Sequence, residues 1–184
     1  MKKRFSFTLV ELLGAMALIV ILAGIAFSGY SYAMNKAKES ATTSTIKQIE
    51  TALEAAKIKA GYYPASANYA VIKFTVDSSE LLQKVEFGST ELSAAKNKKL
   101  FAEFKKIIDF ESIRQNLNNG VLEDAFGGKI YYAFPGKINK TGFDLVSAGP
   151  DGKFGKNNTD APSSDDKSEY YDGSERIVDD ISNF

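Results

Sequence analysis

The chain has 184 residues, with 23 basic and 23 acidic side chains and no cysteine or histidine. This composition excludes a thiol nucleophile, a disulfide framework, thiolate metal sites and the commonest general base. The balanced charge lacks the excess of basic residues that nucleic-acid-binding proteins typically carry. The length suggests one domain besides any membrane segment.

An apolar run from Phe7 to Phe27 dominates the N-terminal end. Its roughly 21 residues are long enough to cross a hydrocarbon core of about 30 Å as a helix. Lys2, Lys3 and Arg4 precede the run, which predicts a cytoplasmic N-terminus and a chain that continues outside. A secretory signal peptide would have a shorter apolar core and a small-residue cleavage site after it. Glu11 interrupts the run, and a carboxylate in a membrane segment is costly enough to suggest a function.

The same helix is predicted to continue to Ala60, because residues 33–60 contain no proline or glycine. Four apolar residues fall on one face of this stretch: Ile46, Ile49, Leu53 and Ala56. This amphipathic pattern predicts that the outer half of the helix packs on a small globular domain. Gly61 is expected to end the helix, and Pro64 cannot continue it.

Two further helices are predicted between residues 65 and 119. Ser79 is a candidate N-cap for a helix through Leu81, Leu82 and Val85. Apolar residues repeat at helical spacing from 100 to 108, which predicts a helix over about residues 90–109. Five lysines decorate that helix, and we interpret them as a solvated face: Lys96, Lys98, Lys99, Lys105 and Lys106.

Short antiparallel strands are predicted in the C-terminal third. The segments Lys129–Phe134 and Phe143–Ser147 are rich in β-forming residues and are bounded by turn signals. A third strand is predicted over Arg176–Ile181. The expected fold class is therefore α+β, with the long N-terminal helix packed on a small antiparallel sheet.

The loop from Gly149 to Tyr171 is rich in Gly, Asn, Asp and Ser and has little apolar surface to bury. Such a segment has little core of its own, so it is either disordered or organised by something else. Seven acids lie in or just after it: Asp151, Asp160, Asp165, Asp166, Asp172, Asp179 and Asp180. Carboxylates and loop carbonyls suit Ca²⁺, although the EF-hand spacing is absent, so composition leaves open a calcium loop and a plain solvated loop.

The residues Lys2-Lys3-Arg4-Phe5-Ser6, followed by Phe7-Thr8-Leu9-Val10-Glu11-Leu12, resemble the leader and cleavage site of type IV pilins and type II secretion pseudopilins. The resemblance implies a leader of residues 1–6 and cleavage between Ser6 and Phe7 by a prepilin peptidase. The new amine of Phe7 would then be methylated. Ser6 stands where the family normally has glycine. The resemblance also implies that Glu11 pairs with the Phe7 amine of a neighbouring subunit, because an unpaired buried charge costs several kcal/mol.

The C-terminal part is similar to the major pseudopilin of type II secretion. The similarity lies in residues 124–132, in Pro135-Gly136, in residues 143–152 and in residues 178–184. It implies one calcium ion that joins the loop after the second strand to the C-terminal strand. The implied ligands are the side chains of Asp151 and Asp180 and the backbone carbonyls of Ala148 and Val178. Asp179 is an alternative to Asp180.

The resemblance predicts a non-enzymatic filament subunit with a leader (1–6), a transmembrane and filament-core helix (7–30) and a periplasmic globular domain (31–184). Its predicted partners are further copies of the chain, minor pseudopilins, the prepilin peptidase, an assembly platform and an assembly ATPase at the bacterial inner membrane, with no nucleic acid. One alternative is a type IV pilin of a surface fibre for adhesion, motility or DNA uptake. A membrane-anchored enzyme is an alternative of another class. A carboxylate-pair hydrolase stays open, although no catalytic motif selects such a pair.

Overall fold

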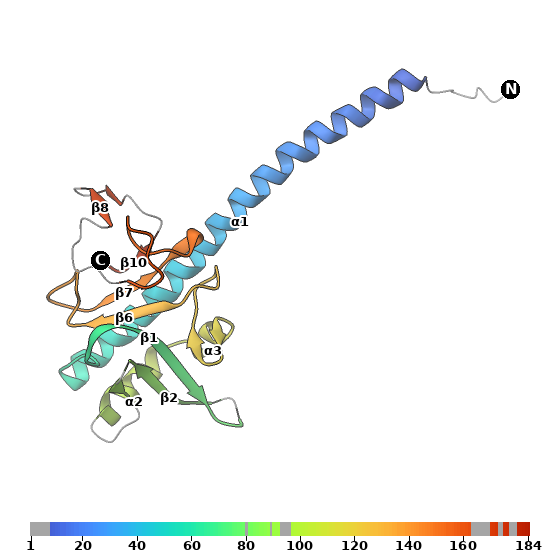
Figure 1. Ribbon diagram of the computed structural model, residues 1–184. Coiled ribbons are helices and arrows are strands. Elements are labelled where there is room, and N and C mark those ends of the chain that lie inside the picture. Colours follow the sequence, from blue (N-terminus) through green and yellow to red (C-terminus); the bar gives the residue numbers. More distant parts are fainter. Residues whose placement is uncertain are drawn as a thin grey trace. The chain divides into compact units, whose positions relative to one another are not determined.

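The computed structural model describes residues 8–79, 81–88, 90–92, 97–162, 170–172, 175–176 and 180–184. The chain divides into two compact units between Ala37 and Lys38, after the boundary at residues 30 and 31 that the sequence suggests. Helix α1 (Leu9–Ala60) begins in the first unit and ends in the second (Figure 1). It contains a stretch long and apolar enough to cross a membrane. The predicted long N-terminal helix is thus confirmed.

Helix α1 ends where the sequence predicts. Gly61 adopts a φ of 92°, in the left-handed region, and its N–H donates to the Lys57 carbonyl at 2.6 Å. This geometry satisfies one of the carbonyls that every helix leaves without a partner at its C-terminal end.

The second unit is built on an antiparallel sheet (Figure 1). Six of its described strands lie side by side, each hydrogen-bonded to the next, in the order β10-β7-β6-β1-β2-β3. These strands are β1 (Ser66–Val76), β2 (Leu82–Phe87), β3 (Thr90–Glu91), β6 (Ile130–Phe134), β7 (Asp144–Ser147) and β10 (Ile181–Ser182). Strand β5 (Val121–Leu122) pairs with both β1 and β4 (Leu117–Asn118). Strands β8 (Tyr171–Asp172) and β9 (Glu175–Arg176) form a separate pair. The α+β fold class is confirmed.

One hydrophobic core joins the later turns of α1 to the sheet and to helix α2 (Lys98–Ile107). The predicted apolar face of α1, from Ile46 to Ala56, is buried in this core. The ring of Phe87 in β2 contacts Tyr132 at 4.7 Å and Phe104 at 6.0 Å between centroids, both edge to face. Fully burying a large aliphatic or aromatic side chain contributes about 1.5–3 kcal/mol, so this face holds the helix to the sheet.

The predicted helix after Ser79 is wrong, because this region is a β-hairpin. Strand β2 pairs with β1, with Val85 opposite Phe74, and β1 was not predicted at all. Asp77, rather than Ser79, organises the turn: its Oδ1 accepts the backbone N–H groups of Ser79 at 2.8 Å and Leu81 at 3.0 Å. Such local bonds from an aspartate stabilise a turn in competition with a helix.

The helix predicted over residues 90–109 is shorter than expected. Thr90–Glu91 form the edge strand β3, α2 covers only Lys98–Ile107, and Asp109 caps the short helix α3 (Phe110–Arg114). The described lysines of the basic cluster are exposed: Lys98, Lys99, Lys105 and Lys106. Lys96 lies outside the described residues.

Strands β6 and β7 confirm the two strands predicted at residues 129–134 and 143–147. The third predicted strand corresponds in part to two separate elements, since Arg176 lies in β9 and Ile181 in β10. Residues 177–179 between them lie outside the described part of the chain.

Candidate functional site

The first turn of α1 is closed by Thr8 and Glu11. The Glu11 carboxylate accepts two hydrogen bonds at 2.8 Å, one from the Thr8 backbone N–H and one from the Thr8 hydroxyl. In return, the Glu11 N–H donates to Thr8 Oγ1 at 3.2 Å. This arrangement is a capping box, in which two N–H groups at the start of a helix find side-chain acceptors. The acid is therefore held at the N-terminal end of α1 by its own chain.

The position of this box relates Glu11 to the predicted cleavage site. Ser6 and Phe7 themselves lie outside the described residues. The Thr8 N–H belongs to the peptide bond that follows Phe7, so the carboxylate reaches to within one residue of the predicted new N-terminus. Sequence reasoning singled out Glu11 but missed Thr8, although the T-x-x-E spacing is a readable capping signal.

The surface around Glu11 is apolar and fully open. Leu9 and Val10 are each 78% exposed, and the large apolar side chains from Leu12 to Phe27 are exposed as well. A contiguous apolar surface of this size indicates contact with a membrane or with other apolar helices. The geometry thus combines a helix that needs an apolar environment with one acid at its start.

The predicted calcium ligands lie in the second unit, where β10 meets β7. Ile181 lies opposite Ser147 in this antiparallel pair, Asp180 directly precedes β10, and Ala148 directly follows β7. Asp180 is only 1% exposed, and its Oδ2 accepts the Gly155 N–H at 2.9 Å. Its Oδ1 is buried and accepts no hydrogen bond from the described residues. Two predicted ligand positions, Val178 and Asp179, lie outside the described residues.

The donor set at this place suits an oxygen-liganded cation only in part. The Asp180 carboxylate and the Ala148 carbonyl are kinds of donor that Ca²⁺ accepts, and both residues lie next to the paired part of β7 and β10. Asp151 is exposed, and its Oδ1 accepts the Lys153 N–H at 2.8 Å. Among the described residues, no three acidic side chains are grouped so that they could hold a metal ion. A cation here would depend mostly on backbone carbonyls and on Asp180.

The first described part of the acidic loop, residues 149–162, is organised by its own contacts. Phe154 is buried and packs edge to face on Tyr131, with 5.4 Å between ring centroids. Its backbone bridges to Thr159, and Lys153 forms an ion pair with Asp160. Tyr170, farther along the loop, is buried as well and packs edge to face on Phe184. The described residues are therefore organised by aromatic contacts that the sequence analysis did not identify.

Asp124, in the part of the sequence that resembles the major pseudopilin, ties the turn before β6 to the end of β7. Its Oδ1 accepts the N–H groups of Phe126 and Gly128, each at 2.8 Å, and its Oδ2 accepts the Ser147 hydroxyl. Because its described bonds stay inside the fold, the structure gives Asp124 a structural role.

Three polar residues of α1 form what we call the polar seam: Thr42, Thr45 and Gln48. Thr42 Oγ1 accepts the Ala125 N–H at 3.1 Å, and Thr45 Oγ1 accepts from the Asn116 amide at 3.2 Å. The Gln48 amide oxygen accepts the Ser112 hydroxyl at 3.0 Å. The polar seam thus joins α1 to α3 and to the segment between α3 and β6 by directed hydrogen bonds.

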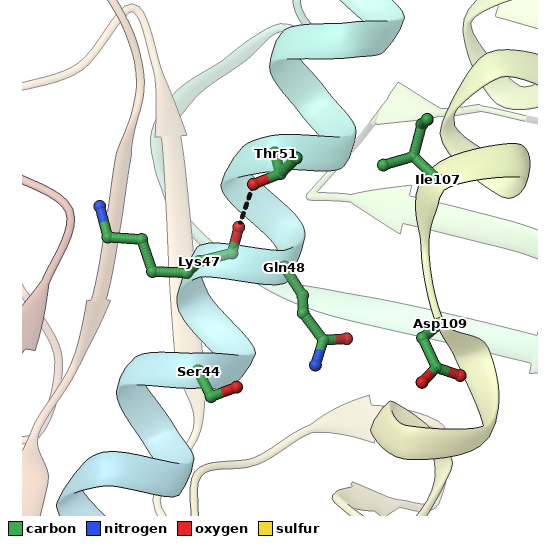
Figure 2. Close-up of a pocket in the computed structure, with 6 residues that line it drawn as sticks. All are labelled: Ser44, Lys47, Gln48, Thr51, Ile107 and Asp109. Atoms are coloured by element: carbon green, nitrogen blue, oxygen red, sulfur yellow. Dashed lines mark hydrogen bonds between the residues drawn. The ribbon is translucent and has the colours of Figure 1, made fainter.

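A cavity of about 270 Å³ lies between α1 and the link from α2 to α3 (Figure 2). It is lined by Ser44, Lys47, Gln48, Thr51, Ile107 and Asp109. Its charged groups serve the fold, since Lys47 pairs with Glu50 at 2.8 Å and Asp109 caps α3. The start of α1 is therefore a better candidate for the functional site than this cavity.

Comparison with known proteins supports the N-terminal site. The family model of the prokaryotic N-terminal methylation motif matches residues 1–27. No curated protein and no solved structure matches the chain. The matched range covers the basic leader, the predicted cleavage site, the capping box and most of the exposed apolar surface. Residues 1–27 thus carry the N-terminal methylation motif that is the hallmark of type IV pilin-like proteins and pseudopilins, the substrates of prepilin peptidases.

Proposed function

We propose that this protein is a filament-forming pseudopilin of a type II secretion system. The observation that carries the proposal is the methylation motif at residues 1–27, placed on a helix whose apolar surface is exposed. The peptidase would cleave between Ser6 and Phe7, and the new Phe7 amine would be methylated. The mature subunit would be stored in the inner membrane with its globular unit in the periplasm, and an assembly ATPase and platform would extract it into a filament.

Glu11 would change partners during assembly. In the single chain its carboxylate is occupied by Thr8, through two hydrogen bonds at 2.8 Å. In a filament core the neighbouring Phe7 amine would offer a full positive charge, so both partners of the bond would be ionised, whereas Thr8 provides only neutral donors. Because the acid already points toward the N-terminal end of α1, the exchange needs little movement of its own side chain.

The surface pilin is the second candidate, because both classes share the motif. Secretion is favoured by the resemblance of residues 124–132, 135–136, 143–152 and 178–184 to the major pseudopilin. The arrangement of β6, β7 and β10 is compatible with that resemblance, since β10 lies beside β7 as the C-terminal strand of that family does.

A calcium ion at the junction of β7 and β10 is part of the proposal. Asp180 and the Ala148 carbonyl would hold it, and Asp151 and Val178 would complete the ligand set, with Asp179 as the alternative carboxylate. The ion would fasten the loop after β7 to the C-terminal strand and so stabilise a surface available to neighbouring subunits.

The decisive experiment is the intact mass and N-terminal sequence of the protein purified from membranes of cells that have a prepilin peptidase. A chain that starts at Phe7, with or without a methyl group, supports the filament class. A chain that still carries Met1 to Ser6 refutes it. Deleting the gene then separates the candidates, because a secretion pseudopilin is needed for the export of proteins and a surface pilin for an external fibre.

A further inference from the structure

Two tyrosines, Tyr30 and Tyr32, follow the apolar run of α1. We call this pair the aromatic belt. They are 64% and 68% exposed, and they lie on the same continuous helix as Glu11. Tyrosine is enriched where a membrane helix leaves the hydrocarbon, because its ring is apolar and its hydroxyl needs water or headgroups. The belt has no other assignment in the fold or in the proposed assembly role.

The distance from Glu11 to the belt matches a bilayer. From Glu11 to Tyr30 the helix advances 19 residues, or about 28 Å at 1.5 Å per residue. A typical hydrocarbon core is about 30 Å thick. The polar capping box and the first tyrosine of the belt can therefore lie at the two opposite headgroup layers at the same time.

The start of the helix supplies an independent reason for this register. The first N–H groups of a helix lack partners within it, and such groups are costly in hydrocarbon. The capping box provides acceptors for some of them, and the rest need water or headgroups. The beginning of α1 at Leu9 therefore belongs in the polar layer, together with the Glu11 carboxylate.

We infer that the capping box and the aromatic belt set the depth of the helix in the bilayer, with the two headgroup layers as their partners. The bilayer centre then lies at Val20 and Ile21, halfway between Glu11 and Tyr30. If instead the apolar run from Phe7 to Phe27 were centred in the bilayer, the bilayer centre would lie at Ala17. That position is about 5 Å along the helix from Val20 and Ile21. In the inferred register Glu11 is solvated before assembly, so the stored subunit does not bury an unpaired charge. The inference requires only that α1 spans a membrane, and it goes beyond the proposed filament function.

The chain contains no tryptophan, so a single introduced tryptophan is an unambiguous depth probe. The full-length protein is reconstituted in phosphatidylethanolamine–phosphatidylglycerol vesicles that contain nitroxide lipids labelled at the headgroup or at shallow or deep acyl positions. The probes are Leu18→Trp, Ile21→Trp and Tyr30→Trp. The inferred register predicts that Ile21→Trp lies deepest, and that the headgroup label quenches Tyr30→Trp most strongly.

A result in which Leu18→Trp lies deepest would overturn the inference in favour of the centred run. Equal quenching of all three probes by every label would also overturn it, because the helix would then have no defined depth. The outcome is independent of cleavage at Phe7, so it cannot be confused with failure of the proposed function.

A second measurement tests the belt itself. In the Ile21→Trp background, Tyr30→Ala together with Tyr32→Ala should move the probe away from the centre by up to about 5 Å, as the apolar run recentres. Tyr62→Ala, which removes an exposed tyrosine outside the run, is the matched control and should leave the probe depth unchanged. An unchanged depth in the double belt variant would show that the tyrosines do not set the register.

Discussion

The buried carboxylate of Asp144 supports the loop between β6 and β7, and its removal gives the sharpest stability prediction. Asp144 is 0% exposed. It accepts hydrogen bonds from the Tyr69 hydroxyl at 2.9 Å and from the N–H groups of Ile138 at 2.8 Å and Asn139 at 2.9 Å. Asp144→Ala leaves all three donors without this acceptor. A buried donor that is left without an acceptor costs about 1–3 kcal/mol of stability. Because the three donor residues are half-buried, we expect the free energy of unfolding to fall by about 3 kcal/mol in total.

Tyr69→Phe is the matched control, because it removes only one of the three bonds and leaves the carboxylate held by two N–H groups. We expect it to cost about 1 kcal/mol. The assay is urea unfolding of the full-length chain in detergent, followed by the near-ultraviolet circular dichroism of tyrosine. The double variant should be no less stable than Asp144→Ala alone, since both changes remove the same hydroxyl bond. A loss for Asp144→Ala within about 1 kcal/mol of that for Tyr69→Phe would refute the reasoning.

Three further predictions follow from particular contacts. Gly120 and Gly61 both have positive φ, but a Cβ at Gly120 would lie 2.7 Å from the Phe74 carbonyl oxygen, whereas at Gly61 it meets open space. Urea unfolding should therefore show a loss of about 1 kcal/mol for Gly61→Ala and a clearly larger loss for Gly120→Ala. Burial raises the pKa of Tyr132 above its ordinary value of 10.0, so the folded state keeps a proton that the unfolded chain loses, and stability should fall as the pH rises past about 10. Tyr132→Phe should flatten this alkaline decline in unfolding free energies measured from about pH 9 to about pH 11, and an equally steep decline would contradict the assignment. Glu11→Ala should leave the urea unfolding of the globular unit unchanged but abolish filaments in electron micrographs, and normal filaments would argue against the proposed pairing.

The sequence predicted the parts of the fold that follow from strong local patterns. The apolar run, the amphipathic turns from Ile46 to Ala56 and the stop at Gly61 all appear as expected in α1. The β-rich segments at residues 129–134 and 143–147 were also read correctly. In these places intrinsic propensity, apolar period and turn residues agree with one another.

The main missed element is the hairpin of β1 and β2. Strand β1 carries a readable signal, since Tyr69–Val76 is rich in β-branched and aromatic residues, and this signal was overlooked. The segment Leu82–Phe87 has a weaker local pattern and is a strand because β1 pairs with it. At the N-terminal site the acid was found because a charge inside an apolar run is conspicuous, whereas Thr8 was passed over as an ordinary residue of the motif. The pairing of β10 with β7, next to which Asp180 and Ala148 lie, depends on strand register, which a resemblance can suggest but spacing alone cannot establish.

The polar seam has a mechanical consequence. Apolar contacts such as those of Ile46 and Leu53 resist separation but tolerate small rotations, because dispersion and burial have little directional preference. The hydrogen bonds at Thr42, Thr45 and Gln48 weaken steeply when their angles change. Helix α1 therefore cannot turn about its own axis beneath the sheet without breaking them. A torque applied to this part of α1 would be transmitted to α3 and to the segment before β6, because the partners of the polar seam lie there.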